Sequence, residues 1–219
     1  MTTTSVTPDN LGLGALPSVP PAPTENVFLA GNPAALGIPV FIAGSVGLGL
    51  TLVGYVPAGA VGAPLAVIAA ATGIGLTIAT IWAMAVGQSA VASVFGIFAG
   101  FWLSYAALVL GLLHNWYAIP ADGVVHTQGV FLISWIVVVG MLTLATLRLP
   151  LAFTAIFALV ELALVAVLIA TINASTGWLK LGGLFVFAFA AVGVYVYFSV
   201  ASAMTGGPEV PLGSPVLKD

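Results

Sequence analysis

The stretch Gly31-Asn32-Pro33-Ala34-Ala35-Leu36-Gly37 marks the point where a polar, proline-rich segment gives way to the first long apolar run. Asn is a residue type that caps helices, because its side-chain oxygen can accept a hydrogen bond from a backbone N–H of the first turn. Pro suits the next position, where no N–H is needed. The stretch therefore predicts a helix that begins at Pro33, with the positive end of its dipole at the edge of the apolar run.

A helix that begins in this way offers backbone N–H groups to an approaching anion. We therefore predict a binding site for a substrate carboxylate at this helix start, formed by Asn32, Pro33, Ala34, Leu36 and Gly37. The alternative is that Asn32 and Pro33 form an ordinary helix start, which their residue types favour when considered alone.

The composition places the chain in a lipid bilayer. Apolar side chains make up 61% of the 219 residues and charged ones 4%, and the mean hydropathy is +1.24. A soluble domain carries about 25% charged residues, so this chain cannot cover a surface that faces water. We predict an all-α integral membrane protein. Its net charge of −3 and lack of a basic stripe exclude a nucleic-acid partner, and the absence of Cys excludes disulfides and thiolate metal sites.

Turn and breaker signals divide the apolar part into six membrane-spanning segments, each with the length of about 20 residues that a bilayer requires. The predicted spans are residues 33–56, 62–86, 89–113, 126–147, 151–172 and 178–204. Residues 32–204 thus form a six-helix transmembrane domain. The segment 1–31 is predicted to be a disordered tail, because it is rich in Thr, Pro, Ser and Gly, and residues 205–219 form a C-terminal tail.

Six spans place both termini on one side of a membrane. Arg148 and Lys218 fall on that side and Lys180 falls on the other. The positive-inside rule then favours cytoplasmic termini in an inner or plasma membrane.

Within the third span, Gly96 and Gly100 form a G-x-x-x-G pattern. Such small faces let helices approach closely, either within the chain or between subunits.

The order of several motifs resembles one known family. Residues 31–38 resemble the N-P-A-P-L-G-L signature of the acetate uptake transporter family of the YaaH type, which includes succinate–acetate permeases. Residues 99–104 (Ala-Gly-Phe-Trp-Leu-Ser) resemble its G-S-F-W-L-T run, 145–148 its G-T-L-K/R turn, 177–178 its G-W pair, and 210–215 its L-P-I-G-x-P tail. Two departures bear on substrate range more than on fold: Ala35 replaces the second Pro, and the apolar Leu76 lies where a polar residue is frequent.

The resemblance implies a homo-hexamer in which each protomer has its own path for acetate and related carboxylates, without a cofactor. By position in the motifs, Phe41, Phe98 and Val160 correspond to an apolar constriction in that path. All three lie eight or nine residues into spans that run in the same direction. At about 1.5 Å per residue they are roughly 12–14 Å deep, near the middle of an apolar layer about 30 Å thick. The alternative is ordinary helix packing.

An apolar constriction favours the uncharged acid over the carboxylate, because desolvating a charge is the expensive step. We expect no Lys or Arg within a span to hold an anion. Helix N-termini and the hydroxyl groups of Ser45, Thr51, Ser93 and Ser104 are then the expected ligands.

Glu161 is the one carboxylate deep in a predicted span. It follows Val160, so it points about 100° away from it around the helix. Two interpretations stay open: a proton-coupling group, or a neutral acid that forms a hydrogen bond to a neighbouring helix or subunit.

His114 and His126 flank a loop that contains Asp122, without the spacing of metal ligands, and no metal site is predicted.

The leading hypothesis is a transporter or channel for small carboxylates, acetate first, with succinate or propionate as further substrates and with or without a linked proton. One alternative is a urea or short-chain amide channel of similar six-helix architecture. Another is a structural or sensory membrane protein without flux. An enzyme is not expected, because the spans contain no Ser/His pair, no paired carboxylates and no metal-ligand spacing.

Overall fold

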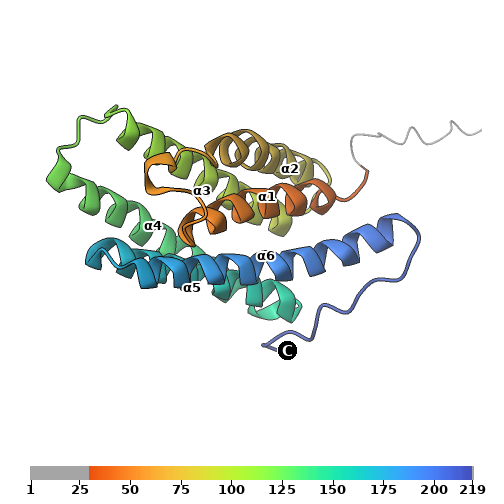
Figure 1. Ribbon diagram of the computed structural model, residues 1–219. Coiled ribbons are helices and arrows are strands. Elements are labelled where there is room, and N and C mark those ends of the chain that lie inside the picture. Colours follow the sequence, from red (N-terminus) through yellow and green to blue (C-terminus); the bar gives the residue numbers. More distant parts are fainter. Residues whose placement is uncertain (1–29, 219) are drawn as a thin grey trace, which may run out of the picture.

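The computed structural model describes residues 30–218, and over that range the chain is all-helical, with six stretches long and apolar enough to cross a membrane (Figure 1). The long helices are α1 (Ala34–Leu52), α2 (Ile74–Ala85), α3 (Ser89–Leu113), α4 (Val124–Ala145), α5 (Leu151–Asn173) and α6 (Thr176–Met204). Short helical turns are η3 (Ala58–Ala60), η4 (Val67–Gly73), η5 (Ala121–Gly123) and η6 (Thr146–Arg148). The predicted fold class, a six-span helical membrane protein, is confirmed.

The first helix ends earlier than predicted. We expected it to continue to residue 56, but α1 ends at Leu52 because Gly54 adopts a left-handed conformation with φ 89°. The N–H of Gly54 donates to the carbonyl of Thr51 at 3.1 Å, and the N–H of Tyr55 donates to that of Leu50 at 3.0 Å. This pair of bonds is the Schellman arrangement, which glycine forms readily because it has no Cβ.

The helices pack as neighbours around a shared interior. α6 packs along both α1 and α5, α4 packs on α5, and α2 packs on α3. Figure 1 shows that α1 begins and α6 ends at the same end of the bundle. The loop between α3 and α4 and the turn between α5 and α6 lie at the opposite end.

A glycine allows the close approach of the second span to α1. The first part of that span, η4, is a π-helix. In this rare form each backbone hydrogen bond joins residues five apart, instead of four apart as in an α-helix. Within it, the fully buried hydroxyl group of Thr72 donates to the carbonyl of Val40 at 2.7 Å. A Cβ on Gly44 would lie 2.5 Å from Thr72 Oγ1, so this bond requires glycine at position 44.

The G-x-x-x-G pattern of α3 packs within the chain. The position that a Cβ of Gly96 would take is 3.2 Å from Thr80 of α2, and that of Gly100 is 3.5 Å from Trp135 of α4. Of the two packing partners considered from the sequence, the structure shows helices of the same chain at both positions.

The C-terminal segment folds back along α6 and reaches the start of α5 (Figure 1). Tyr195 Oη donates to the carbonyl of Pro211 at 2.7 Å. The N–H of Ala152 donates to the carbonyl of Leu212 at 3.0 Å. The predicted N-terminal tail lies outside the described residues except at its end, where Trp82 Nε1 donates to the carbonyl of Ala30 at 3.1 Å.

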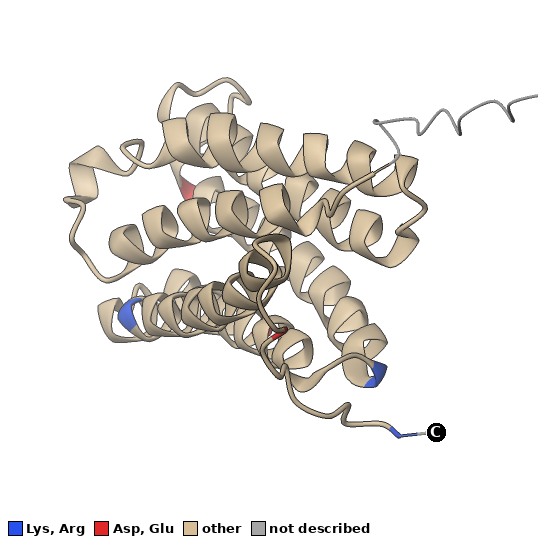
Figure 2. Cartoon of the chain, turned by 90° about the vertical axis from the view of Figure 1, so that its right-hand side faces the viewer, with Lys and Arg blue, Asp and Glu red and all other residues tan. Residues whose placement is uncertain are grey.

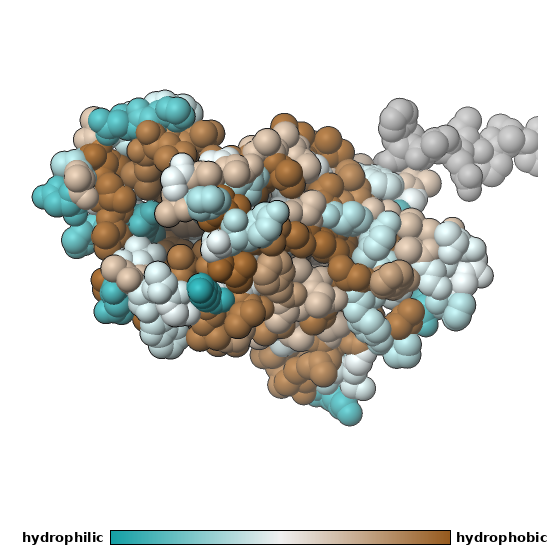
Figure 3. All heavy atoms as spheres, viewed as in Figure 1, coloured by the Kyte–Doolittle hydropathy of each residue, from teal (hydrophilic) through white to brown (hydrophobic). Residues whose placement is uncertain are grey.

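The outer surface suits lipid. One face of α4 exposes an apolar stripe made of Val130, Ile133, Val137, Met141 and Leu144. Figure 2 shows how few Lys, Arg, Asp and Glu residues the helices carry. Figure 3 shows apolar residues across the middle of one face and hydrophilic ones at the end that carries the α3–α4 loop. Helices can present such a surface to a bilayer because their backbone N–H and C=O groups are hydrogen-bonded within the segment.

Candidate functional site

A cavity of about 780 Å³ opens at the end of the bundle opposite the chain termini. α1, α3 and α5 end at this opening and α4 and α6 begin there, and all five helices contribute to the wall, whereas α2 does not. The exposed residues at the opening, called the mouth below, include Pro57, Ala58, Leu113, Ala174 and Thr176. The rest of the lining is mostly apolar.

The cavity ends in the interior at a group of five side chains, called the floor below. Since α1, α3 and α5 run toward the mouth, the first lining residue on each is the deepest, and these are Phe41, Phe98 and Val160. The deepest lining residues on α4 and α6, which run away from the mouth, are Leu132 and Phe189. The structure therefore brings the three sequence-predicted side chains together at the inner end of one cavity.

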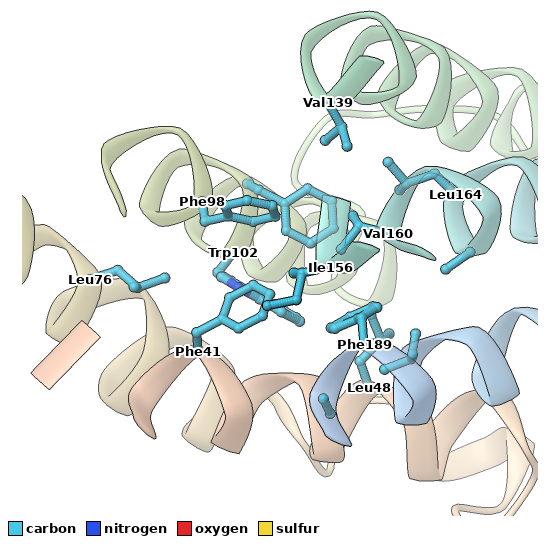
Figure 4. Close-up of a cluster of buried hydrophobic side chains, with 14 of the residues drawn as sticks. Phe41, Leu48, Leu76, Phe98, Trp102, Val139, Ile156, Val160, Leu164 and Phe189 are labelled. Carbon is cyan, nitrogen blue, oxygen red and sulfur yellow. The ribbon is translucent and has the colours of Figure 1, made fainter. Parts of the chain in front are cut away.

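The floor is held by aromatic contacts. The ring of Phe41 meets that of Phe98 edge-on, with centroids 5.0 Å apart, and lies 5.6 Å from that of Phe189. Behind the floor, Phe157 stacks on Phe98 at 5.8 Å. Figure 4 shows Val160 beside the same cluster. No described residue nearer the termini than the floor lines the cavity.

Sequence reasoning missed Leu132 and Phe189. The motifs pointed only to the first, third and fifth spans, so the fourth and sixth were not searched for floor residues. A depth count would have indicated Phe189, which lies 13 residues after the start of α6 and 15 before its end. No motif marks Leu132, although it lies eight residues after the start of α4, as deep as Phe41 lies in the first predicted span.

Trp102 lies in the cavity wall one helical turn from Phe98 on the mouth side. Its side chain is 1% exposed, and its ring centroid lies 6.3 Å from that of Phe41 and 5.0 Å from that of Phe101. Its Nε1 has no hydrogen-bond partner within the described part of the chain.

The mouth side of the cavity is polar in places. Lys180 and Gln128 line it. The expectation that no cation lies within a span is wrong at Lys180, which lies in the first turns of α6 and within the predicted sixth span as well. Of the four hydroxyl groups expected as ligands, only that of Thr51 belongs to a lining residue. Ser45 Oγ is instead buried and donates to the carbonyl of Phe41 at 2.7 Å.

The helix start at Asn32 is capped as predicted. Asn32 Oδ1 accepts a hydrogen bond from the N–H of Ala34 at 3.0 Å, and Pro33 has helical φ and ψ of −58° and −23°. The next N–H groups also have partners within the chain: that of Ala35 donates to the carbonyl of Asn32, and those of Leu36 and Gly37 donate to that of Pro33.

A carboxylate at this helix start would therefore have to replace existing hydrogen bonds. The helix-start residues also lie outside the lining of the cavity, at the other end of α1. Gly37 instead accommodates the ring of Phe95, which lies 2.3 Å from the position that a Cβ would take. Substrate binding at the helix start stays a prediction.

Glu161 lies against α4 and does not line the cavity. Its Oε1 is 3.9 Å from the position that a Cβ of Gly140 would take. Its Oε2 is buried without a hydrogen-bond partner among the described residues. This placement agrees with the expected rotation away from Val160.

The described residues hold no group of three or more His, Asp and Glu side chains that could bind a metal ion. His114 stacks on Trp116, with ring centroids 5.7 Å apart.

Comparisons with known proteins agree with this architecture. Meiotically up-regulated gene 86 protein of Schizosaccharomyces pombe (strain 972) is 31% identical over 165 residues, which cover 71% of this chain and 53% of the relative. The chain thus spans about half the length of that curated relative. The structure of the bacterial acetate channel SatP is similar with a TM-score of 0.73 at 23% identity, over 84% of this chain and 99% of that one, which shows a shared fold. Residues 15–206 match the GPR1/FUN34/yaaH family, so the chain belongs to this family, as the sequence motifs implied.

Proposed function

We propose that this protein carries acetate and related small carboxylates, such as succinate or propionate, across a membrane through a path within each protomer. The observation that carries the proposal is the cavity, which leads from one end of a six-span bundle to a floor that contains Phe41, Phe98 and Val160. Membership of the GPR1/FUN34/yaaH family supports it, as does the fold shared with a protein described as an acetate channel.

The cavity offers two environments to a carboxylate in succession. Near the mouth, Lys180 and Gln128 supply a positive charge and an amide that can hydrogen-bond. At the floor, Phe41, Phe98 and Val160 are nearly fully buried, and removing a charge from water there is expensive. An apolar constriction of this kind gates by excluding water and favours the uncharged acid.

Passage requires the floor to open. The aromatic rings contact one another directly, so a substrate must displace at least one of them. In this mechanism Phe41, Phe98 and Val160 set the width of the path. The helix start formed by Asn32, Pro33, Ala34, Leu36 and Gly37 is the proposed carboxylate site on the far side of the floor.

We extend the proposal to assembly and location. A homo-hexamer in an inner or plasma membrane is the arrangement that we expect, with cytoplasmic termini. The exposed apolar stripes of the helices suit contact with lipid or with other copies. Arg148 lies toward the terminal end of the bundle and Lys180 toward the mouth. The orientation of the protein in the membrane therefore rests on the distribution of few positively charged residues between the two ends.

Uptake of radiolabelled acetate by liposomes that contain the purified protein tests the function. We expect uptake above that of empty liposomes, competition by succinate or propionate, and no competition by urea, at both low and neutral pH. Free passage of urea without acetate would establish the amide-channel alternative. Flux of neither solute would refute both transport hypotheses and leave the structural or sensory alternative standing.

A further inference from the structure

The indole N–H of Trp102 is a buried hydrogen-bond donor for which residues 30–218 provide no acceptor. Most buried polar atoms in proteins have a partner, because an unpaired one loses its hydrogen bonds to water without replacement. The side chain is 1% exposed, so bulk solvent does not reach its N–H directly. The donor therefore calls for an explanation.

The surroundings of Trp102 explain why no protein acceptor reaches it. Its ring neighbours are Phe41, Phe101 and Tyr105, with centroids 5.0–6.5 Å away. The walls of the cavity at this depth are aromatic and aliphatic. Since no described residue accepts from this N–H, a molecule that enters the cavity is the candidate partner.

The position of Trp102 along the cavity is informative. α3 runs toward the mouth, and Trp102 follows Phe98 by one turn, which is about 6 Å along the helix axis. A molecule that arrives from the mouth thus passes the indole immediately before it meets the floor. Trp102 is in addition in ring contact with Phe41 of the floor.

We propose that the indole N–H of Trp102 donates a hydrogen bond to a carboxyl oxygen of the substrate and holds it next to the floor. This inference rests on the proposed function and names a substrate-binding residue for it. A neutral donor can bind either the carboxylate or the carbonyl oxygen of the uncharged acid. One neutral hydrogen bond is also weak enough for the substrate to move on, which conduction requires.

The direct test is NMR of the full-length protein with ¹⁵N-labelled tryptophan indoles, titrated with sodium acetate. The chain has five tryptophans, and the variant W102F assigns the signal of Trp102. We expect this signal to shift with saturable dependence on acetate, whereas that of Trp135 does not. Trp135 is the matched control, since it contacts the same aromatic cluster, 5.3 Å from Phe101, but does not line the cavity.

Transport gives a second readout. We expect W102F to raise the half-saturating acetate concentration about tenfold, and W135F to leave it unchanged. Because W102F also removes ring volume, a further variant carries 3-benzothienylalanine at position 102, which keeps the two-ring shape and replaces the N–H by sulfur. We expect this variant to fold like the wild type and to show the same rise in half-saturating acetate concentration as W102F.

The outcomes distinguish the proposed role of Trp102 in acetate binding from the proposed transport function. Acetate uptake without an indole shift, or a benzothienylalanine variant with wild-type affinity, would overturn the role of Trp102 and leave the transport function intact. An indole shift without uptake would support the binding residue and refute transport. If neither is seen, both proposals fail.

Discussion

Replacement of Phe41 by alanine removes the ring that joins α1 to the rest of the floor. Phe41 contacts Phe98 at 5.0 Å and Phe189 at 5.6 Å. Aromatic pairs of this kind contribute about 0.5–1.5 kcal/mol each. If both contacts must be broken for a substrate to pass, their loss lowers the barrier by about 1–3 kcal/mol, which corresponds to a rate about 5- to 150-fold higher.

The gain should be largest for acids bulkier than acetate, because the lost ring also widens the path. We therefore expect F41A to raise the ratio of succinate to acetate uptake in liposomes. The assay compares initial rates of both labelled acids at equal amounts of reconstituted protein. The same ratio is measured at low and neutral pH, so that a change in the ionisation of the acids is not mistaken for a change in width.

F187A is the matched control. Phe187 packs against Gly49 at the interface of α1 and α6 and does not line the cavity. Both variants lose a packed ring, which costs up to about 3–5 kcal/mol in a protein core, so loss of stability alone would affect both. Unchanged acetate and succinate rates in folded F41A would refute the placement of Phe41 in the path.

Three further substitutions test separate features. G44A places a methyl group 2.5 Å from Thr72 Oγ1, and we expect it to lower stability by about 1–3 kcal/mol; an unchanged melting temperature in detergent would contradict this packing. K180Q should raise the half-saturating acetate concentration up to about fivefold at low salt and have little effect at high salt, because exposed charges are screened. A salt-independent effect would argue against an electrostatic role. E161Q should leave the pH profile of uptake unchanged, since Glu161 faces Gly140 away from the cavity; a flattened profile would assign proton coupling to it.

Local features of the chain were predictable from sequence. The capped start at Asn32 follows from the chemistry of two neighbouring residues, and the structure shows the bond to the N–H of Ala34. The third span matches the prediction at both ends. The end of α1 was placed too late because Gly54, whose positive φ ends the helix, was not considered.

The candidate site was predictable only in part. Motif positions indicated Phe41, Phe98 and Val160, and their depths agreed with one another, but no motif pointed to Leu132, Phe189 or Lys180 as lining residues of the cavity. The N–H groups of the helix start were expected to be available for a ligand, whereas carbonyl groups of the same turn occupy several of them. Whether an N–H group of the helix start is free for a ligand or bonded to a nearby carbonyl depends on the conformation of the whole turn.

The sequence by itself determined that this protein lies in a membrane with six helical spans, because length and hydropathy are properties of each segment alone. Only the tertiary structure decided which side chains face the cavity. The spans are apolar on all sides, so no polar stripe marks an inward face. Their rotation is instead set by contacts between distant residues, such as Gly44 with Thr72 and Gly73 with Leu103. The tertiary structure places both Trp102 and Lys180 in the lining of the cavity.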